Sequence, residues 1–545
     1  MPTTHDFPIP APDKGAGNEA YLLCFDENLR CWVLIKAQKP FCAPAPERSI
    51  SMTSKKLQRA RDFEKKYSPY VASELPSFHV TAPIGWINDP NGFAPYKGEY
   101  HLFYQYHPYD VKWGPMHWGH VKTTDFVKWE RLPAALAPDM DYDKDGCFSG
   151  GAVEMPDGRH LLMYTGVRNV RRKNGKIDSF QTQCIAIGDG VNYEKFEGNP
   201  VIRSEDIPEN GSVHDFRDPK IWREDDRFYM VVGNRTPDTS GSILLYRSED
   251  AIHWEFVNKL ASCHNQYGKM WECPDFFRLD GKYVLLTSPQ EMNAVGLEFH
   301  PGNANVCIIG DLNEQKNHLL RDNVQAIDYG LDFYAPQTLE TYDGRRVMIG
   351  WMQNWETCGS HLPEQRFMGQ MTLPRELHIR NGRLCQTPVR EIENYRINKV
   401  AYQNVMMTGE TSLQGVSGRF IDMTVTIRPG NEASMYRWFK INVARDGEHC
   451  TSIRFKPATN IVRIDRTQSG LPCDIVNVRE FPVFAGNGEL KLRLIMDRYS
   501  LEVFVNDGEQ AATSVIYPPL DAKSISFSCD GTVLMDVEKY DLVVE

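Results

Sequence analysis

The sequence predicts an all-β protein whose middle part is a five-bladed β-propeller. Five short apolar runs, rich in β-branched and aromatic residues, recur at intervals of several tens of residues. A turn signal rich in Gly or Asp precedes every run, as in a β-hairpin. The runs are His101–Gln105, Leu161–Tyr164, Phe228–Val232, Tyr283–Thr287 and Arg346–Gly350. This repetition is typical of a propeller with one four-stranded sheet in each blade.

The length of the chain indicates more than one domain, because 545 residues exceed what a single core usually fills. We assign residues 1–75 to an N-terminal extension and helix, residues 76–390 to the propeller and residues 400–545 to a second β domain. The strands expected in this last part are longer and alternate between apolar and polar residues, as in Leu490–Ile495 and Leu501–Val505.

The N-terminal extension differs in composition from the rest of the chain. Proline-rich stretches flank two apolar runs, Ala20–Phe25 and Arg30–Lys36, which predict a hairpin. The segment Ser54–Tyr67 then predicts a helix that its first residue caps. We expect residues 1–51 to be either a small accessory hairpin or an extension before a natural start at Met52.

Composition excludes several classes of function. The formal net charge of −11 disfavours a nucleic-acid binder, which usually carries a basic face. The 13 cysteines are scattered and lack metal-type pairs, which favours free thiols in a reducing compartment. No apolar run is long enough to span a membrane, and no signal peptide is recognisable. We therefore expect a cytoplasmic protein, a monomer or homodimer, without a cofactor, a metal, a nucleic-acid partner or a membrane.

Three short motifs carry acidic side chains. They are Trp86–Gly92, which contains Asp89-Pro90-Asn91-Gly92, then Arg217-Asp218-Pro219, then Trp271–Asp275. Each motif alone is typical of an ordinary turn or strand start, because proline fixes φ and Asn and Gly tolerate positive φ. It is their combination in one chain that points to chemistry.

Together and in this order, the three motifs resemble the signature set of glycoside hydrolase family 32, the invertase-type β-fructofuranosidases. The resemblance covers nearly the whole chain after about Ser77. It implies a five-bladed propeller followed by a β-sandwich. It also implies that Asp89 is the nucleophile, that Asp218 stabilises the transition state and that Glu272 is the general acid/base.

The resemblance further implies a set of residues that hold the fructosyl unit: Asn88, Gln105, Trp113, Phe148, Ser149, Arg217 and Trp351. Without it, core packing is the simpler interpretation of each aromatic residue in the set. Tyr334 matches a family motif and is expected to support the pocket. Cys273 is expected to pack beside Glu272 and not to act as a nucleophile.

These assignments predict a retaining hydrolase of sucrose and short fructooligosaccharides, with two carboxyl groups roughly 5–5.5 Å apart. The alternatives are a sucrose-6-phosphate hydrolase, a fructosyltransferase, a catalytically inactive sugar-binding propeller and an inverting arabinan-type hydrolase. A basic run from Arg168 to Lys176 is typical of a solvated hairpin tip, but it could contact a sugar phosphate.

Overall fold

The computed structural model describes residues 21–26, 31–36, 53–359, 362, 364–430, 435–470 and 475–544. The chain divides into two compact units, Met1–Met52 and Thr53–Glu545. In the first unit, strand β1 (Tyr21–Asp26) pairs antiparallel with β2 (Cys31–Lys36), which confirms the two predicted strands. The other expectations for residues 1–51 lie outside the described residues.

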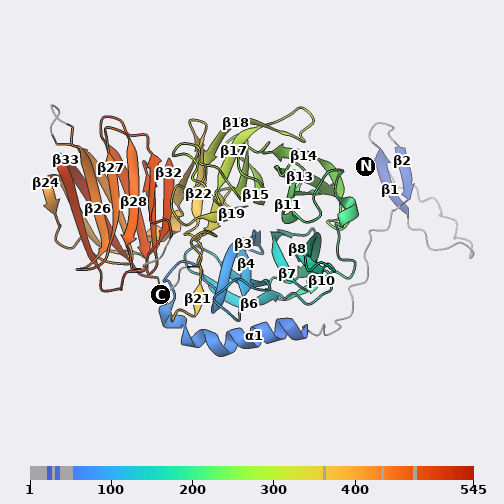
Figure 1. The fold of residues 1–545 in the computed structure, drawn as a ribbon. Coiled ribbons are helices and arrows are strands. Elements are labelled where there is room, and N and C mark those ends of the chain that lie inside the picture. Colours follow the sequence, from blue (N-terminus) through green and yellow to red (C-terminus); the bar gives the residue numbers. More distant parts are fainter. Residues whose placement is uncertain are drawn as a thin grey trace, which may run out of the picture. The chain divides into compact units, whose positions relative to one another are not determined.

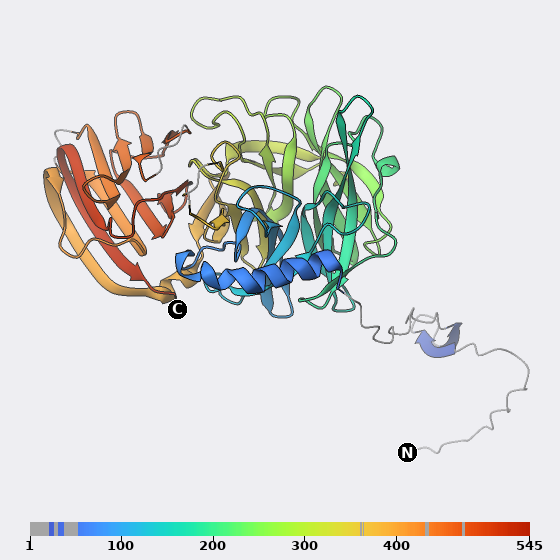
Figure 2. The same ribbon diagram turned by 60° about the horizontal axis from the view of Figure 1, so that its bottom comes forward.

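The second unit begins with helix α1 (Lys55–Tyr67), as the sequence predicts. The side chain of Ser54 caps the helix by accepting a hydrogen bond from the amide of Leu57 at 3.2 Å. The helix buries Leu57 and Ala60 against strand β6 (Glu130–Leu136), and its Glu64 accepts a hydrogen bond from the amide of Ala134. Figures 1 and 2 show α1, in blue, lying across the blades. Two short 3-10 helices follow it, η1 (Ser68–Tyr70) and η2 (Ala72–Glu74).

Five antiparallel four-stranded sheets form the propeller, and each begins with its innermost strand. The first two blades are β3 (Gly85–Tyr96), β4 (Glu99–His107), β5 (His117–Thr123) and β6, then β7 (Gly146–Glu154), β8 (His160–Arg171), β9 (Ile177–Gly188) and β10 (Tyr193–Lys195). The third and fourth are β11 (Phe216–Glu224), β12 (Arg227–Arg235), β13 (Gly241–Ser248) and β14 (Glu255–Ser262), then β15 (Trp271–Leu279), β16 (Lys282–Pro289), β17 (Val306–Leu312) and β18 (Leu319–Ala326). The fifth is β19 (Tyr334–Glu340), β20 (Arg346–Trp351), β22 (Arg375–Arg380) and β23 (Arg383–Pro388).

The five predicted apolar runs form the second strand of the five blades, β4, β8, β12, β16 and β20. The turn residues before them explain why. Lys97 and Gly98 have φ of 47° and 84°, and Asp280 and Gly281 have the same two values. Positive φ at both central residues is the type I′ geometry that joins two twisted strands most tightly. Local turn chemistry therefore sets the first hairpin of these blades.

Every innermost strand has a β-bulge in its first half. The register shifts lie between Ile87 and Pro90, Phe148 and Gly150, Arg217 and Lys220, Glu272 and Asp275, and Tyr334 and Gln337. In three of these strands the residue before a proline is left-handed: φ is 66° at Asp218, 47° at Cys273 and 51° at Ala335. A bulge bends a strand and re-aims its side chains. All three acidic motifs lie at such bulges.

A short strand closes the ring of blades. β21 (Phe367–Met368) pairs parallel with the start of β3, with Phe367 opposite Gly85 and Met368 opposite Trp86. The segment that follows the fifth blade's second strand thus adds to the first blade, next to the first acidic motif. This arrangement joins the two ends of the propeller.

The rest of the chain is the β-sandwich that the resemblance implies (Figure 1). Its longest strand, β33 (Ser524–Leu542), pairs with β26 (Trp438–Arg445) in its first part and with β25 (Ile421–Pro429) in its second part. It therefore joins the strands that pair beyond β26 to those that pair beyond β25 in one hydrogen-bonded series. The other strands are β24 (Arg396–Thr411), β25 (Ile421–Pro429), β26 (Trp438–Arg445), β27 (Cys450–Lys456), β28 (Ile461–Gln468), β29 (Val478–Pro482), β30 (Leu490–Asp497), β31 (Ser500–Val505) and β32 (Gln510–Val515). The remaining 3-10 helices are η3 (Ser204–Asp206) and η4 (Arg390–Tyr395).

Buried charges join the propeller to the sandwich. The guanidinium of Arg375, on β22, is fully buried and pairs with Asp328 at 2.9 Å and with Glu502 on β31. His79, just before the first blade, lies 2.9 Å from both Asp497 and Glu502. Because the partners come from both parts of the chain, this cluster fixes the sandwich to the propeller.

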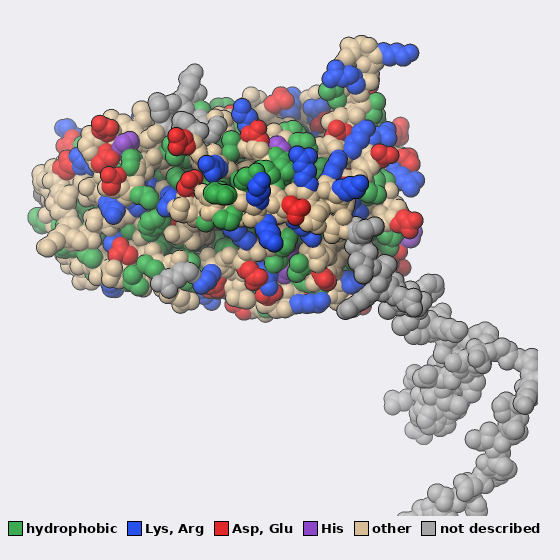
Figure 3. Space-filling view, turned by 90° about the horizontal axis from the view of Figure 1, so that it is seen from below, with side chains coloured by type: hydrophobic (Ala, Val, Ile, Leu, Met, Phe, Trp, Pro, Cys, Tyr) green, Lys and Arg blue, Asp and Glu red, His purple; other side chains and the backbone are tan. Residues whose placement is uncertain are grey.

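The face of the molecule on which α1 lies does not present one dominant charge. Figure 3 shows Lys and Arg side chains interspersed with Asp and Glu on the face where α1 lies. Within the described ranges, no helix has the length and apolar character that a membrane crossing would need. The same ranges contain no group of three His, Cys, Asp or Glu side chains arranged to hold a metal ion.

Candidate active site

The three acidic motifs converge at one end of the propeller axis. Asp89, Asp218 and Glu272 lie in the first halves of the innermost strands β3, β11 and β15. The thiol of Cys273 lies 3.4 Å from Oδ2 of Asp89 and 3.7 Å from Oδ2 of Asp218. Since Cys273 directly follows Glu272, these contacts bring all three carboxyl groups to one place. Residues from the first, third and fourth blades thus form a single cluster.

Asp89 is held by donors on both of its oxygen atoms. Oδ2 accepts a hydrogen bond of 2.6 Å from the hydroxyl of Ser149, on β7. Oδ1 accepts one of 3.0 Å from the amide of Asn88, whose own oxygen accepts the indole N–H of Trp86 at 2.7 Å. Donors on both oxygens hold the carboxylate of Asp89 in one orientation.

Asp218 is fixed by its own backbone as well as by its neighbours. It is 3% exposed and has a left-handed φ of 66°, which an ordinary strand does not allow. Its amide donates to the hydroxyl of Thr165 at 3.0 Å, and its Oδ2 accepts the amide of Cys273 at 3.0 Å. The bulge therefore turns this carboxyl group toward the cluster.

Glu272 has a cation on one carboxyl oxygen and a phenol on the other. Oε1 accepts hydrogen bonds from Nε and Nη2 of Arg217 at 3.1 and 3.0 Å. Oε2 lies 2.6 Å from the hydroxyl of Tyr334, which also lies 3.0 Å from the carbonyl of Ser288. Glu272 thus differs from Asp89 in its partners, as two carboxyls with different tasks require.

A second layer of residues orients Arg217, and the sequence reasoning did not identify it. Nη1 of Arg217 donates to Asp215 at 3.1 Å and to Gln181 on β9 at 3.3 Å. Asp215 in turn pairs with Arg235 at 2.7 Å. Asp215 precedes the Arg217-Asp218-Pro219 motif by two residues, and this position could have indicated a role beside the motif. Gln181 belongs to no motif, and its role follows only from the pairing of strands.

Burial and mutual repulsion raise the pKa of the aspartates in the cluster. Burial, with a further contribution from Glu272, raises the pKa of Asp89. Burial raises the pKa of Asp218 to about 7; Arg217 opposes this shift, whereas Glu272 and Asp89 add to it. For Arg217, burial lowers the pKa, but the neighbouring carboxylates outweigh burial and raise it. Burial and the neighbouring carboxylates therefore favour the protonated form of the aspartates in the cluster.

The predicted aromatic residues fall into two groups. Trp113 is 48% exposed and meets the ring of Phe148 edge-on, with 6.0 Å between the centroids. Trp351, by contrast, is fully buried and lies against Trp86 and Trp355, at 5.9 and 5.0 Å. In the described structure Trp351 thus packs among aromatic rings, including the partly buried Trp355, and its contact with a sugar stays a prediction.

Gln105 lies in the same region, and its side-chain amide is hydrogen-bonded to another strand of the protein. It is 2% exposed, and its amide donates to the carbonyl of Cys147 at 3.0 Å. Cys147 precedes Phe148 on β7, so Gln105 ties β4 to the strand that carries Ser149. In the described structure its contacts are those of a residue that positions the pocket wall.

In the basic run, Arg168 and Arg171 lie at the end of β8, and Arg172, Lys173 and Lys176 lie in the connection to β9; all five side chains are exposed. β8 pairs with β7 so that Val167 lies opposite Gly146 and His160 opposite Glu154. The end of β8 therefore extends beyond the start of β7, the end near Ser149. The predicted exposed hairpin is confirmed, and it rises from the same end of the propeller as the carboxyl cluster.

Such a cluster can perform acid/base and nucleophilic chemistry on a glycoside. It offers a carboxylate held by donors, a second carboxyl group between a cation and a phenol, and a third buried carboxyl group beside them. These are the components that an oxocarbenium-like transition state needs. Two of the flanking aromatic side chains, Trp113 and Phe148, retain exposed surface.

Comparisons with known proteins agree with this arrangement. Residues 79–388 match the model of the glycosyl hydrolases family 32 N-terminal domain, and residues 391–542 match that of the family 32 C-terminal domain. A sucrose-6-phosphate hydrolase of Zymomonas mobilis is 36% identical over 506 residues, covering 89% of this chain and 96% of that protein. A raffinose invertase of Escherichia coli is 37% identical over 468 residues, covering 84% and 93%. Among solved structures, a family 32 β-fructofuranosidase of Bombyx mori is 34% identical with a TM-score of 0.75, covering 89% of this chain and 98% of that one. An aspartate-to-alanine mutant of that enzyme was solved in complex with sucrose.

Proposed function

The chain belongs to glycoside hydrolase family 32, and on this premise we propose that it is a retaining β-fructofuranosidase that releases the terminal fructosyl unit of sucrose. Hydrolysis of sucrose is the activity that the family and the relatives support. The observation that carries the proposal is the different environment of the two carboxyl groups. Asp89 accepts hydrogen bonds from neutral donors, whereas Glu272 lies between Arg217 and Tyr334.

In the first half of the proposed reaction, the carboxylate of Asp89 attacks the anomeric carbon C2 of the fructosyl unit. The bond between C2 and the glycosidic oxygen breaks, and the carboxyl of Glu272 gives its proton to that oxygen. The products of this step are glucose and a fructosyl ester of Asp89. The donors from Ser149 and Asn88 keep Asp89 oriented for attack.

In the second half, the Glu272 carboxylate removes a proton from water while the water oxygen attacks C2. The ester bond breaks, fructose leaves, and Asp89 regains its charge. Asp218 binds sugar hydroxyls, and these hydrogen bonds strengthen as the ring flattens and positive charge develops. Asn88, Ser149, Trp113, Phe148 and Trp351 complete the proposed fructosyl site, with Gln105 as a support.

A substrate panel tests the proposal. The protein is given sucrose, sucrose 6-phosphate, kestose, inulin and levan, and the products are followed by chromatography and by polarimetry. We expect glucose to leave sucrose first and fructose to follow in the β-anomeric form, because two displacements retain configuration. Release of the α-anomer would show inversion and overturn the mechanism. Oligosaccharides longer than the substrate would indicate fructosyl transfer.

A second candidate is a sucrose-6-phosphate hydrolase with the same chemistry. Two observations favour it: several relatives carry that name, and the exposed basic run rises from the end of blade two that bears Ser149. Replacing Arg171, Arg172 and Lys173 by Gln tests it. A loss of more than about tenfold on the 6-phosphate alone, about 1.4 kcal/mol, would favour the phosphorylated substrate. An equal effect on both substrates would leave sucrose as the substrate.

A further inference from the structure

Four charged side chains form a series that runs from the protein surface to Glu272. Arg235 pairs with Oδ2 of Asp215 at 2.7 Å, and Oδ1 of Asp215 accepts a hydrogen bond from Nη1 of Arg217 at 3.1 Å. Nε and Nη2 of Arg217 donate to Oε1 of Glu272. The signs of the charges alternate, so each group is held by a neighbour of opposite charge. We call these four residues the charge series.

Only the outer end of the charge series is open to solvent. The side chain of Arg235 is 36% exposed, whereas those of Asp215 and Glu272 are 16% and 13% exposed. Charges in such a partly buried place act on one another more strongly than in water, because the effective dielectric constant is lower. Asp215 and Arg235 can therefore influence Glu272 through Arg217.

The backbone of Asp215 is fixed independently of its side chain. Its amide donates to the hydroxyl of Ser212 at 3.0 Å, and its carbonyl accepts a hydrogen bond from the side-chain amide of Asn234 at 2.8 Å. Asn234 is 1% exposed and also donates to the carbonyl of Ser212. A change confined to the carboxyl group, such as Asp215→Asn, therefore leaves these contacts in place.

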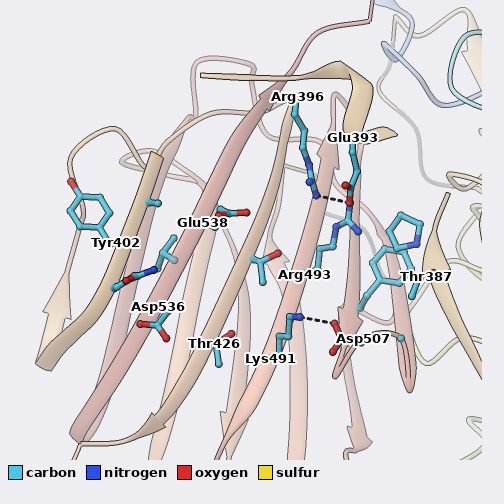
Figure 4. Close-up of a pocket in the computed structure, with 17 residues that line it drawn as sticks. Thr387, Glu393, Arg396, Tyr402, Thr426, Lys491, Arg493, Asp507, Asp536 and Glu538 are labelled. Atoms are coloured by element: carbon cyan, nitrogen blue, oxygen red, sulfur yellow. Dashed lines mark hydrogen bonds and ion pairs between the residues drawn. The ribbon is translucent and has the colours of Figure 1, made fainter. Parts of the chain in front are cut away.

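Ion pairs of the ordinary exposed kind provide a contrast. Two of them line a cavity of about 520 Å³ on the sandwich, Arg396 with Glu393 and Lys491 with Asp507 (Figure 4). The side chains of Lys491 and Asp507 are 44% and 61% exposed, and exposed pairs contribute little because solvent and salt screen them. The charge series differs because it ends at a carboxyl group of the catalytic cluster.

The proposed reaction requires both protonation states of Glu272, because the group gives a proton in the first half and takes one in the second. The positive charge of Arg217 favours the ionised form of Glu272, and the negative charge of Asp215 opposes this effect. Arg235 in turn offsets the charge of Asp215. The balance among these three charges therefore sets how readily Glu272 keeps the proton that the leaving group needs.

We propose that Asp215 and Arg235 are positioning residues that set the pH range of the acid/base step through Arg217. Asp215 limits the hold of Arg217 on the ionised form of Glu272, and Arg235 limits this effect of Asp215. The inference rests on the proposed function, because it takes Glu272 as the general acid/base.

Other titratable groups near Glu272 belong to the catalytic cluster. They are Asp89 on β3, Asp218 on β11, Cys273 on β15 and Tyr334 on β19. A substitution at Asp215 or Arg235 leaves all four of them in place. A shift in the pH profile of such a variant therefore reports on the charge series.

The pH dependence of kcat/KM for sucrose tests the proposal, because its basic limb reports loss of the proton from the general acid of the free protein. Asp215→Asn should move the basic limb to lower pH by about one unit, since Arg217 then acts on Glu272 without opposition. Arg235→Gln should move it to higher pH by a smaller amount, since its more exposed charge is better screened.

Arg223 and Asp226 provide the matched controls on the same blade. They pair at 2.6 Å at the turn between β11 and β12, six residues along β11 from Arg217, which corresponds to roughly 20 Å. Asp226→Asn and Arg223→Gln make the same changes of charge there and should leave the basic limb in place.

Shifts in opposite directions in Asp215→Asn and Arg235→Gln would support the proposal. A lower rate at every pH with an unmoved basic limb would overturn it, because a purely structural role has that effect. Shifts in the same direction in both variants would also overturn it. If sucrose is not cleaved by the unmodified protein, the proposed function and this inference fail together. If sucrose is cleaved and the limb does not move, the inference alone fails.

Discussion

The hydroxyl of Tyr334 lies between two acceptors, Oε2 of Glu272 at 2.6 Å and the carbonyl of Ser288 at 3.0 Å. A phenol has one proton to donate and can also accept. When Glu272 is ionised, Tyr334 can donate to it. When Glu272 is protonated, the carboxyl can donate to the phenol, which then donates to Ser288. One tyrosine thus serves both protonation states that an acid/base residue must adopt.

We expect Tyr334→Phe to lower kcat for sucrose by about tenfold to a hundredfold, because a hydrogen bond to a charged group contributes about 1.5–3 kcal/mol. KM should change little, since Tyr334 is buried beneath Glu272. Steady-state kinetics on sucrose measures both constants. Tyr70→Phe is the control, because Tyr70 is 65% exposed. An unchanged kcat in Tyr334→Phe would contradict a role for Tyr334 in proton transfer.

Local chemistry explains why much of the fold could be predicted from the sequence. Asp280 and Gly281 adopt the positive φ values of a tight hairpin whatever surrounds them. Ser54 caps α1 through the amide of Leu57, a contact within one turn. The acidic motifs were recognised because the three together resemble the family signature; that each lies at a β-bulge appears only in the structure.

Contacts between distant segments could not be predicted in the same way. Gln181 reaches Arg217 only because β9 lies beside the start of β11, and nothing around Gln181 in the sequence marks it. Trp351 lies against Trp86 and Trp355, which are contacts that its neighbours in the sequence do not indicate. Arg375 meets Glu502, which lies 127 residues further along the chain. Such pairs follow from the closed ring of blades and from the docked sandwich.

Removal of the buried cation between the two domains should destabilise the protein. Arg375→Met leaves Asp328 and Glu502 buried without their main counter-ion. Breaking a buried pair in this way costs about 3–5 kcal/mol. We expect a correspondingly lower free energy of unfolding in urea, measured by circular dichroism and by tryptophan fluorescence.

The control for this change is Arg437→Met, because the pair of Arg437 with Asp530 is exposed. Its effect should stay within about 0.5 kcal/mol. A loss of equal size in both variants would mean that the buried cluster contributes no more than a surface pair. A large loss in Arg375→Met alone would identify the cluster as the link between propeller and sandwich.

Four buried histidines predict that stability falls in mild acid. Burial lowers the pKa of His101 and of His117 to about 4, and it lowers the pKa of His120 and His160 well below their usual value. These imidazoles are neutral in the folded protein but charged in the unfolded chain below about pH 6.5. Their contribution is therefore present above pH 6.5 and is lost as the pH falls toward 4.

We expect the free energy of unfolding to fall by about 1.4 kcal/mol per pH unit for each such histidine in this window. His120→Phe removes one of them, and the new ring can stack on Phe103 as the imidazole does at 4.0 Å. The variant should show a shallower pH dependence in urea unfolding. His253→Gln, with a side chain that is 86% exposed, should keep the original slope. Equal slopes in all three proteins would contradict the explanation.

The roles of the three carboxyl groups make the most direct prediction. Glu272→Ala should lower sucrose cleavage by several orders of magnitude, because leaving-group protonation and water activation both use this group. A fructoside with an activated leaving group needs no proton and should still form the covalent intermediate. Azide should then rescue its breakdown. Asp89→Ala should gain little from an activated leaving group, since no ester can form without the nucleophile.

Asp218→Asn should also lose most activity, because the carboxylate no longer stabilises the positive charge of the transition state. The fructosyl ester should nevertheless remain detectable on Asp89 when the protein is quenched in acid, digested and analysed by mass spectrometry. Glu249→Gln, whose side chain is 86% exposed, is the control and should behave like the unmodified protein. A fructosyl adduct on Asp218 or Glu272 would show that the nucleophile has been assigned to the wrong residue, because the ester forms on the carboxylate that attacks the sugar.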